Sequence, residues 1–101
     1  MLEYDNIRLE LESFAEPVST LRDSLHIDHV LIEISELEAR TQEPEFWNDV
    51  EKAQKLQTSL KRLQKKVESF NDLASEREDL LALCELGNEA EDEETLEELK
   101  E

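Results

Sequence analysis

Apolar residues recur through the second half of the chain at alternating spacings of three and four. The run comprises Ala53, Leu56, Leu60, Leu63, Val67, Phe70, Ala74, Arg77, Leu81 and Cys84. Arg77 is its only charged member. This spacing places one side chain per turn on the same face of a helix and is typical of a coiled-coil seam. We therefore predict one long helix over about residues 49–86, about 57 Å long at 1.5 Å per residue.

Both ends of this helix carry sequence signals. Asn48 followed by Glu51 fits a capping box, and Gly87, the only glycine, stands where a left-handed C-terminal cap belongs. After an acidic connection, Asp92 is expected to cap a last helix. No stop signal follows before Glu101, so we expect this last helix to be truncated and to continue in a longer protein.

The first half of the chain repeats the pattern with a break. Its apolar positions are Ile7, Leu11, Phe14, Val18, Leu21 and Leu25. Pro17 lies inside this run, and a proline in a helix interior removes a hydrogen bond, so we expect a kink near residues 14–16 or a helix that starts there. A second helix, with Asp28 as the expected cap, runs to about Thr41. The two helical segments together predict a broken N-terminal arm that lies antiparallel to the long helix. The alternative is a tighter hairpin.

The predicted fold class is all-α: an elongated antiparallel helical bundle or coiled coil, in a single helical domain over residues 1–101. Pro44 ends the second helix and begins the connection to the long one. Phe46 and Trp47 follow in this turn. Adjacent aromatic residues in such a turn either form a recognition knob or close the apolar end of a bundle. We expect Phe46 and Trp47 to be structural, with Trp47 buried.

Charge is distributed unevenly along the chain. The 101 residues include 28 acidic and 11 basic ones, which gives a net charge of −17. Residues 52–66 contain no acid and form what we call the basic segment: Lys52, Lys55, Lys61, Arg62, Lys65 and Lys66. This segment carries +6 and leaves −23 on the rest of the chain. Its side chains either pair with acids of the preceding helices, or form a docking face for an acidic partner or a local RNA contact.

The same composition excludes several functions. A negative net charge repels phosphate backbones, so we expect little direct nucleic-acid binding by the domain. No apolar run approaches the length of a membrane span, and the N-terminus lacks a signal peptide, so we expect a soluble, cytoplasmic chain without a membrane partner. Cys84 is the only cysteine; it cannot form an internal disulfide, and we expect it to pack in the core.

No group of residues indicates catalysis or metal binding. His26 and His29 lie three residues apart, but they straddle the expected helix break and have no further His or Cys nearby. The carboxylates fall mostly at solvent-facing helical positions without a dry pocket, which argues against general acid–base catalysis. We therefore expect a chain that is not an enzyme and has no metal or cofactor.

Several stretches of the sequence resemble a known family. They are residues 43–49 with the Phe-Trp-Asn turn, residues 52–55, the acidic run 89–94, and the opening residues 2–4 and 9–12. Together they resemble the N-terminal helical domain of bacterial peptide chain release factor 2, a class I release factor, over essentially the whole chain. The turn is the most specific part, because the sister factor lacks its tryptophan. Pro17 departs from the family's uninterrupted first helix.

The resemblance implies a translation termination factor that releases the finished peptide at stop codons on the ribosome. The family's Ser-Pro-Phe and Gly-Gly-Gln motifs are absent from this sequence, so no codon-reading or catalytic residue carries over. The family's first domain is expected to contact the stalk-base protein of the large subunit, near the partner release GTPase. The alternative is a self-contained acidic coiled-coil adaptor that dimerises, and self-association of the isolated fragment is also compatible with the long seam.

Overall fold

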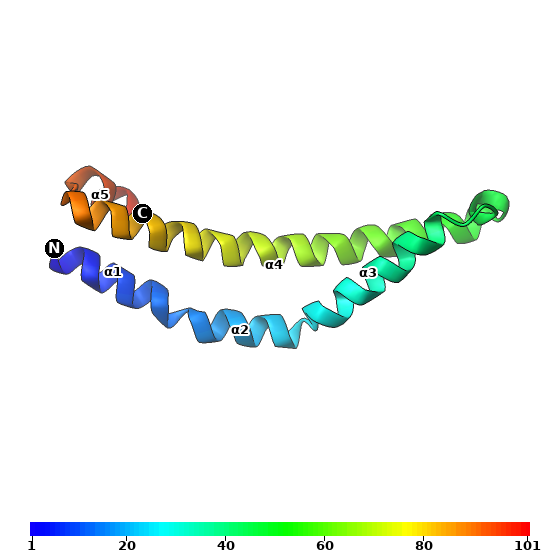
Figure 1. The fold of residues 1–101 in the computed structure, drawn as a ribbon, viewed down its shortest axis with the longest axis horizontal. Coiled ribbons are helices and arrows are strands. Elements are labelled where there is room, and N and C mark those ends of the chain that lie inside the picture. Colours follow the sequence, from blue (N-terminus) through cyan, green and yellow to red (C-terminus); the bar gives the residue numbers. More distant parts are fainter. The chain divides into compact units, whose positions relative to one another are not determined.

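The computed structural model describes residues Met1 to Glu101, and every regular element in it is a helix. The elements are α1 (Leu2–Ser13), α2 (Ala15–Ser24), α3 (Ile27–Thr41), the 3-10 helix η1 (Phe46–Asn48), α4 (Val50–Ala90) and α5 (Glu93–Lys100) (Figure 1). The prediction of an all-α fold is thus confirmed. None of these helices combines the length and the hydropathy that crossing a membrane requires.

The chain forms two compact units. Unit 1 consists of residues Met1–Leu21 and Asp72–Glu101, and unit 2 of residues Arg22–Asn71. Unit 1 therefore holds α1, most of α2, the C-terminal part of α4 and α5. Unit 2 holds α3, η1 and the N-terminal part of α4, so each unit combines a segment of the first half of the chain with one part of the long helix.

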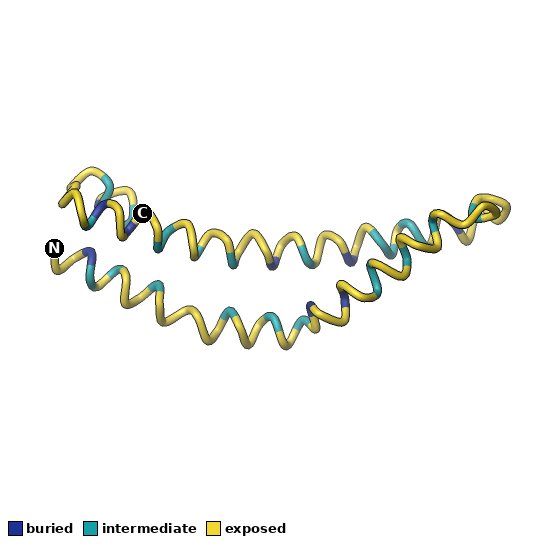
Figure 2. The backbone as a smooth tube through the Cα atoms, in the orientation of Figure 1, coloured by how far each residue is buried: buried dark blue, intermediate teal, exposed yellow.

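The core of unit 1 is a cluster of three buried side chains, one from each of α1, α4 and α5: Tyr4, Cys84 and Leu96. Partly buried apolar residues pack against this cluster, namely Ile7, Leu11 and Leu99. Figure 2 marks buried and partly buried positions on α1, α4 and α5. The core position that the sequence predicts for Cys84 is confirmed.

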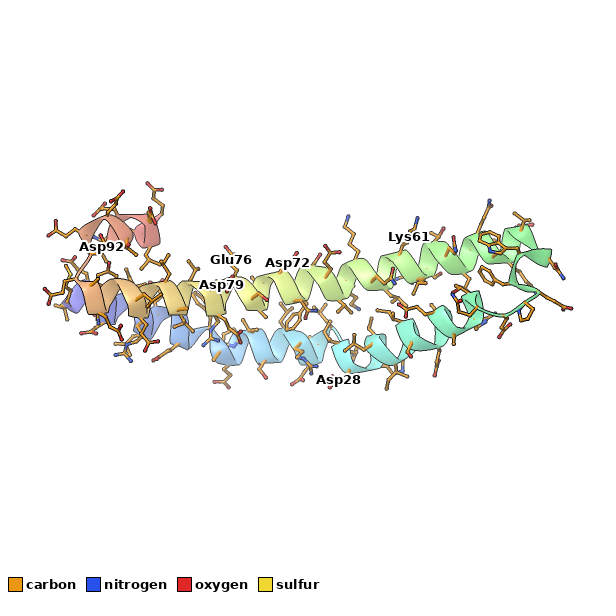
Figure 3. All side chains as sticks on the ribbon, turned by 45° about the horizontal axis from the view of Figure 1, so that its top comes forward. Asp28, Lys61, Asp72, Glu76, Asp79 and Asp92 are labelled. Carbon is orange, nitrogen blue, oxygen red and sulfur yellow. The ribbon has the colours of Figure 1, made fainter.

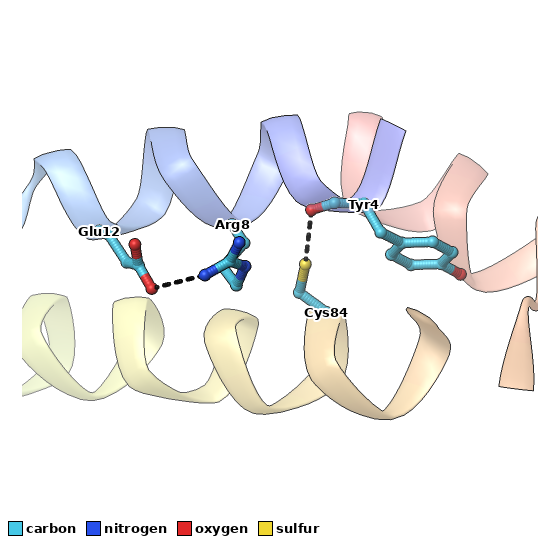
Figure 4. Close-up of polar contacts among 4 residues, drawn as sticks. All are labelled: Tyr4, Arg8, Glu12 and Cys84. Carbon is cyan, nitrogen blue, oxygen red and sulfur yellow. Dashed lines mark hydrogen bonds and ion pairs between the residues drawn. The ribbon is translucent and has the colours of Figure 1, made fainter. Parts of the chain in front are cut away.

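Within unit 1, α1 and the C-terminal part of α4 run antiparallel. The thiol of Cys84 donates to the backbone carbonyl of Tyr4, with Sγ and O 3.4 Å apart (Figure 4). About two turns further along, Nε of Arg77 donates to the carbonyl of Leu11 at 2.8 Å. The contact at Arg77 also explains the one charged residue in the seam, because its guanidinium binds a backbone oxygen across the helix pair.

Unit 2 is held together by the inner faces of α3 and α4. Its buried side chains are Ile27, Val30, Ala53, Leu63 and Phe70. On the same pair of helices, Nε2 of Gln64 donates to Oε1 of Glu38 at 3.1 Å. Leu63 is buried as the seam predicts, whereas Leu60, one turn earlier, is only partly buried. The seam residues of α4 therefore face the packed side of the helix, but they are not all buried to the same extent.

The break predicted around Pro17 lies at Phe14, between α1 and α2. The N–H of Phe14 bonds to the carbonyl of Leu11 at 3.2 Å, and the helix resumes when the N–H of Val18 bonds to the carbonyl of Phe14 at 2.9 Å. Pro17 consequently stands in the first turn of α2. Because the first N–H groups of a helix have no intrahelical acceptor, the missing donor of proline costs little there.

The predicted C-terminal end of the long helix is wrong. α4 continues to Ala90, and Gly87 is an ordinary helical residue without a positive φ. The left-handed residue is instead Glu91, with φ of 51°. Asp92 follows it and caps α5 as predicted, since its Oδ1 accepts the N–H groups of Glu94 at 3.0 Å and of Thr95 at 3.3 Å.

Gly87 provides space for packing. A Cβ atom at this position would lie 2.7 Å from Oη of Tyr4 and 2.9 Å from Cγ2 of Thr95, so any larger residue would displace them. The hydroxyl of Tyr4 in turn donates to the backbone carbonyl of Asp92. The glycine thus permits the close approach of α1 and α5 to α4.

We expect Gly87→Ala to destabilise the protein by up to about 2 kcal/mol, because overpacking costs about 1–3 kcal/mol and exceeds the roughly 1 kcal/mol that alanine gains in helix propensity. Urea unfolding followed by circular dichroism measures the difference. The control is Ser75→Ala at an exposed position of α4, which should leave the free energy of unfolding unchanged or slightly higher. A gain in stability for Gly87→Ala would show that Tyr4 and Thr95 can move aside.

The predicted N-terminal cap of the long helix is also wrong. Asn48 belongs to η1, and the capping side chain is that of Asp49, whose Oδ1 accepts the N–H of Lys52 at 3.1 Å. Asp49 has the extended backbone, φ −111° and ψ 94°, that an N-cap residue requires. The capping box predicted from Asn48 and Glu51 is therefore replaced by a single aspartate cap one residue later.

The cap predicted for the second helix is wrong as well. His26 is the N-cap of α3, with a left-handed backbone and no side-chain cap hydrogen bond. Asp28 instead pairs with Arg22, with Oδ1 2.5 Å from Nη2 and Oδ2 3.0 Å from Nη1. Because a guanidinium offers two parallel donors to a carboxylate, this bidentate pair outcompetes the backbone for the aspartate.

Candidate docking surface

The basic segment lies on the N-terminal part of α4, within unit 2. All six of its side chains are exposed, while Ala53 and Leu63 of the same stretch are buried. The basic positions therefore alternate with the seam and face away from it. Figure 3 shows Lys61 on the side of α4 that points away from α3.

The ion pairs of the chain bear on one of the two interpretations of this segment, internal pairing. Only Lys55 has a partner, Glu51, with Nζ and Oε1 3.5 Å apart on the same helix. The other ion pairs of the chain involve none of the six basic residues. No pair joins the segment to an acid of the preceding helices, so internal pairing does not account for the cluster.

The remaining charge is concentrated in unit 1. This unit contains 18 acidic and 3 basic residues, a net charge of −15, whereas unit 2 contains 10 acidic and 8 basic residues, a net charge of −2. The chain therefore carries a strongly acidic unit and, in the other unit, a basic helix face. By charge, a binding surface in unit 1 would therefore select basic partners, whereas the basic segment in unit 2 would select acidic ones.

The aromatic turn has the predicted position but not the predicted burial. Phe46 and Trp47 lie in η1, between α3 and α4. Their rings form an edge-to-face pair with centroids 5.1 Å apart and an interplanar angle of 77°. Trp47 is 54% exposed, so the expectation of a buried tryptophan is wrong. Within so short a turn, the indole packs on its neighbour Phe46 and leaves much of its surface in solvent.

The titratable groups with shifted pKa values belong to structural contacts. Hydrogen bonds from Thr95 lower the pKa of Asp92, and the hydrogen bond from Arg22 lowers the pKa of Asp28. Burial raises the pKa of the Cys84 thiol and of the Tyr4 phenol. A raised pKa keeps the thiol protonated and therefore poorly nucleophilic at neutral pH.

The two histidines do not come together with other ligands. His26 is the N-cap of α3 and His29 lies in its first turn, and both are exposed. The chain has no cluster of three or more His, Cys, Asp or Glu side chains placed to hold a metal ion. What the exposed residues offer for function is therefore charge and apolar surface.

Comparison with known proteins identifies relatives of this chain. The family described as PCRF domain matches residues 30–101. The peptide chain release factor 2 of Haemophilus ducreyi is 39% identical over 96 residues, which are 95% of this chain and 26% of that protein. The peptide chain release factor 2 of an Exiguobacterium species is 38% identical over 100 residues, or 99% and 27% of the two chains.

The peptide chain release factor 2 of Listeria innocua is 34% identical over 99 residues, or 98% of this chain and 27% of that protein. The chain thus spans about a quarter of the length of the curated relatives it matches. No solved structure matches it significantly. The comparisons do not support the alternative of a self-contained adaptor. Since the family match extends over most of the sequence, the chain belongs to the PCRF domain family and is similar, along nearly its whole length, to bacterial peptide chain release factor 2.

Proposed function

We propose that this chain is the docking domain of a translation termination factor that directs stop-codon-dependent release of the nascent peptide on the ribosome. Its similarity to peptide chain release factor 2 supports this role. The chain holds a single glycine and so lacks the Gly-Gly-Gln motif of the family. In this proposal it is not itself an enzyme, and it positions a catalytic region that lies elsewhere in the factor.

The observation that carries the docking role is the basic segment. It presents six exposed cations, and internal ion pairs engage only one of them. Charges of this kind steer encounter and fix orientation more than they add affinity. The acidic remainder of the chain is repelled by ribosomal RNA, so the basic segment is the face that can approach an acidic surface of the ribosome.

The family resemblance suggests where this contact occurs. We place the domain against the stalk-base protein of the large subunit, near the site of the partner release GTPase, and hence in the cytoplasm. The strongly acidic unit 1 is compatible with this position, because ribosomal proteins do not repel it as ribosomal RNA does. The domain requires no cofactor for such a role.

Sedimentation of the 101-residue chain with ribosomes tests the proposal. We expect the variant Lys61→Gln, Arg62→Gln, Lys65→Gln and Lys66→Gln to bind at least about fivefold more weakly than the wild type. The reason is that four exposed ion pairs contribute about 1–4 kcal/mol together. Binding of the wild type should also weaken as salt is raised, because exposed charges are screened.

A second variant with the same change in net charge serves as the control. It carries Ser19→Glu, Thr20→Glu, Ser75→Glu and Ala82→Glu, all at exposed positions of unit 1. We expect this variant to bind ribosomes like the wild type and to remain folded at the assay temperature, although its added like charges lower its melting temperature. The glutamine variant should keep the melting temperature of the wild type. Undiminished binding of the glutamine variant would refute the role of the basic segment, and equal losses in the two variants would reduce it to an effect of net charge.

A further inference from the structure

Unit 1 contains an apolar groove that the chain does not fill. Its volume is about 320 Å³, and its apolar lining comes from α1 to α2 on one side and from α4 on the other. Large side chains that line it remain substantially exposed: Phe14 at 47%, Leu73 at 45% and Leu21 at 37%. α2 has no buried residue at all. These residues occupy seam positions or their neighbours, yet no partner helix covers them.

The groove opens where two features interrupt the seam. Phe14 marks the break between α1 and α2, so the helix that would face α4 is interrupted beside the groove. On α4, Arg77 occupies the seam position between Leu73 and Leu80, and its guanidinium is engaged with the carbonyl of Leu11. A charged side chain thus takes the place of the apolar one that would close the contact, and the flanking apolar residues are left accessible.

Acidic side chains border the apolar lining. Asp72, Glu76 and Asp79, which Figure 3 labels on α4, follow one another at helical spacings of four and three. This spacing places them in one row along the helix, directly beside Leu73 and Leu80 in the sequence. Glu76 also contributes to the lining itself. All three carboxylates are exposed and have no ion-pair partner.

The net charge of unit 1, −15, determines which occupant fits. A second copy of this chain would bring an equally acidic unit to the same place and would be repelled. A helix with an apolar row flanked by Lys or Arg would instead bury its apolar side chains in the groove and set its cations against the acidic row. The lining from Leu73 to Leu80 matches about two turns of such a helix.

We propose that this groove docks an amphipathic helix of a partner protein that carries Lys or Arg beside its apolar row. The surface is separate from the basic segment, lies in the other unit and selects the opposite charge. The proposal for the groove can therefore be tested and refuted separately from the docking role proposed for the basic segment.

Synthetic peptides are the probes for this site. The first has leucines at helical spacings of three and four with lysines elsewhere, the second has glutamates in place of the lysines, and the third scrambles the first. Fluorescence anisotropy of labelled peptide with the 101-residue chain measures binding. We expect the first peptide to bind at least tenfold more tightly than either of the others. Equal binding of the scrambled lysine peptide would show attraction to an acidic surface alone and would overturn the proposal.

Two variants connect binding to the groove. Leu73→Gln should weaken binding of the lysine peptide at least tenfold, whereas Leu86→Gln, at a 65% exposed position outside the groove, should not. Glu76→Lys combined with Asp79→Lys leaves the apolar lining largely intact and should shift the preference toward the glutamate peptide. Equal effects of Leu73→Gln and Leu86→Gln would exclude the groove. Self-association of the chain that Leu73→Gln abolishes would assign the groove to a second copy and overturn the proposal.

Discussion

Replacing Tyr4 with alanine is expected to lower the melting temperature by at least about 12 °C. Truncation of a buried aromatic side chain costs about 3–5 kcal/mol, and each kcal/mol shifts the midpoint by about 4–8 °C in a domain of this size. Tyr4 is fully buried, joins α1 to α4 and α5, and donates its hydroxyl to the carbonyl of Asp92. Thermal unfolding followed by circular dichroism measures the effect.

Tyr4→Phe is the matched variant for this prediction. It keeps the ring against Gly87 and removes only the hydroxyl, which leaves the carbonyl of Asp92 without this donor. We expect the melting temperature of Tyr4→Phe to lie measurably below that of the wild type and above that of Tyr4→Ala. If both Tyr4 variants melted like the wild type, the three-helix cluster could not be the core of unit 1.

The second large effect is expected in unit 2. Leu63→Ala should lower the free energy of unfolding by about 2–5 kcal/mol, because a buried leucine loses both its transfer free energy and its packing contacts. Leu63 is 8% exposed, whereas Leu60 is only partly buried. Leu60→Ala, the same chemical change one turn earlier, should therefore cost distinctly less. Urea unfolding of the two variants provides the comparison, and a larger cost at Leu60 would contradict the packing described for α3 and α4.

The sequence predicts what depends on local periodicity. The three-four spacing from Ala53 to Cys84 specifies both the long helix and the face that it buries, and the structure confirms α4 and the burial of Leu63, Phe70 and Cys84. The position of the break at Phe14 follows from Pro17 for the same local reason. These features need no knowledge of distant residues.

The features that the sequence mispredicts depend on distant contacts or on fine geometry. The sequence predicts that Gly87 ends the helix, because it does not show that Tyr4 and Thr95 lie against this residue. The sequence predicts that Asp28 caps a helix, because it does not show that Arg22 binds its carboxylate. Trp47 is expected to be buried because aromatic residues in such a turn close the apolar end of a bundle, but in this three-residue turn its ring packs on Phe46 and stays largely exposed.

The candidate sites show the same division. All six residues of the basic segment can be identified from sequence, because exposure follows from their positions off the seam. The apolar groove escapes sequence analysis, since most of the residues that line it are apolar positions with the spacing of a closed helix pair. The signals that could have indicated it are the proline break near Phe14 and the arginine at position 77, which lie on facing sides of the same gap.

Competition on the ribosome tests the docking role most directly. The 101-residue chain is added in excess to a termination assay with a bacterial release factor 2, and the rate of peptide release is measured as the factor concentration is varied. A docking domain predicts that the chain slows release at low factor concentration, that more factor restores the full rate, and that the glutamine variant of the basic segment does not inhibit. Folded chain that leaves the rate unchanged, or that lowers the maximal rate at saturating factor, would contradict the proposed role.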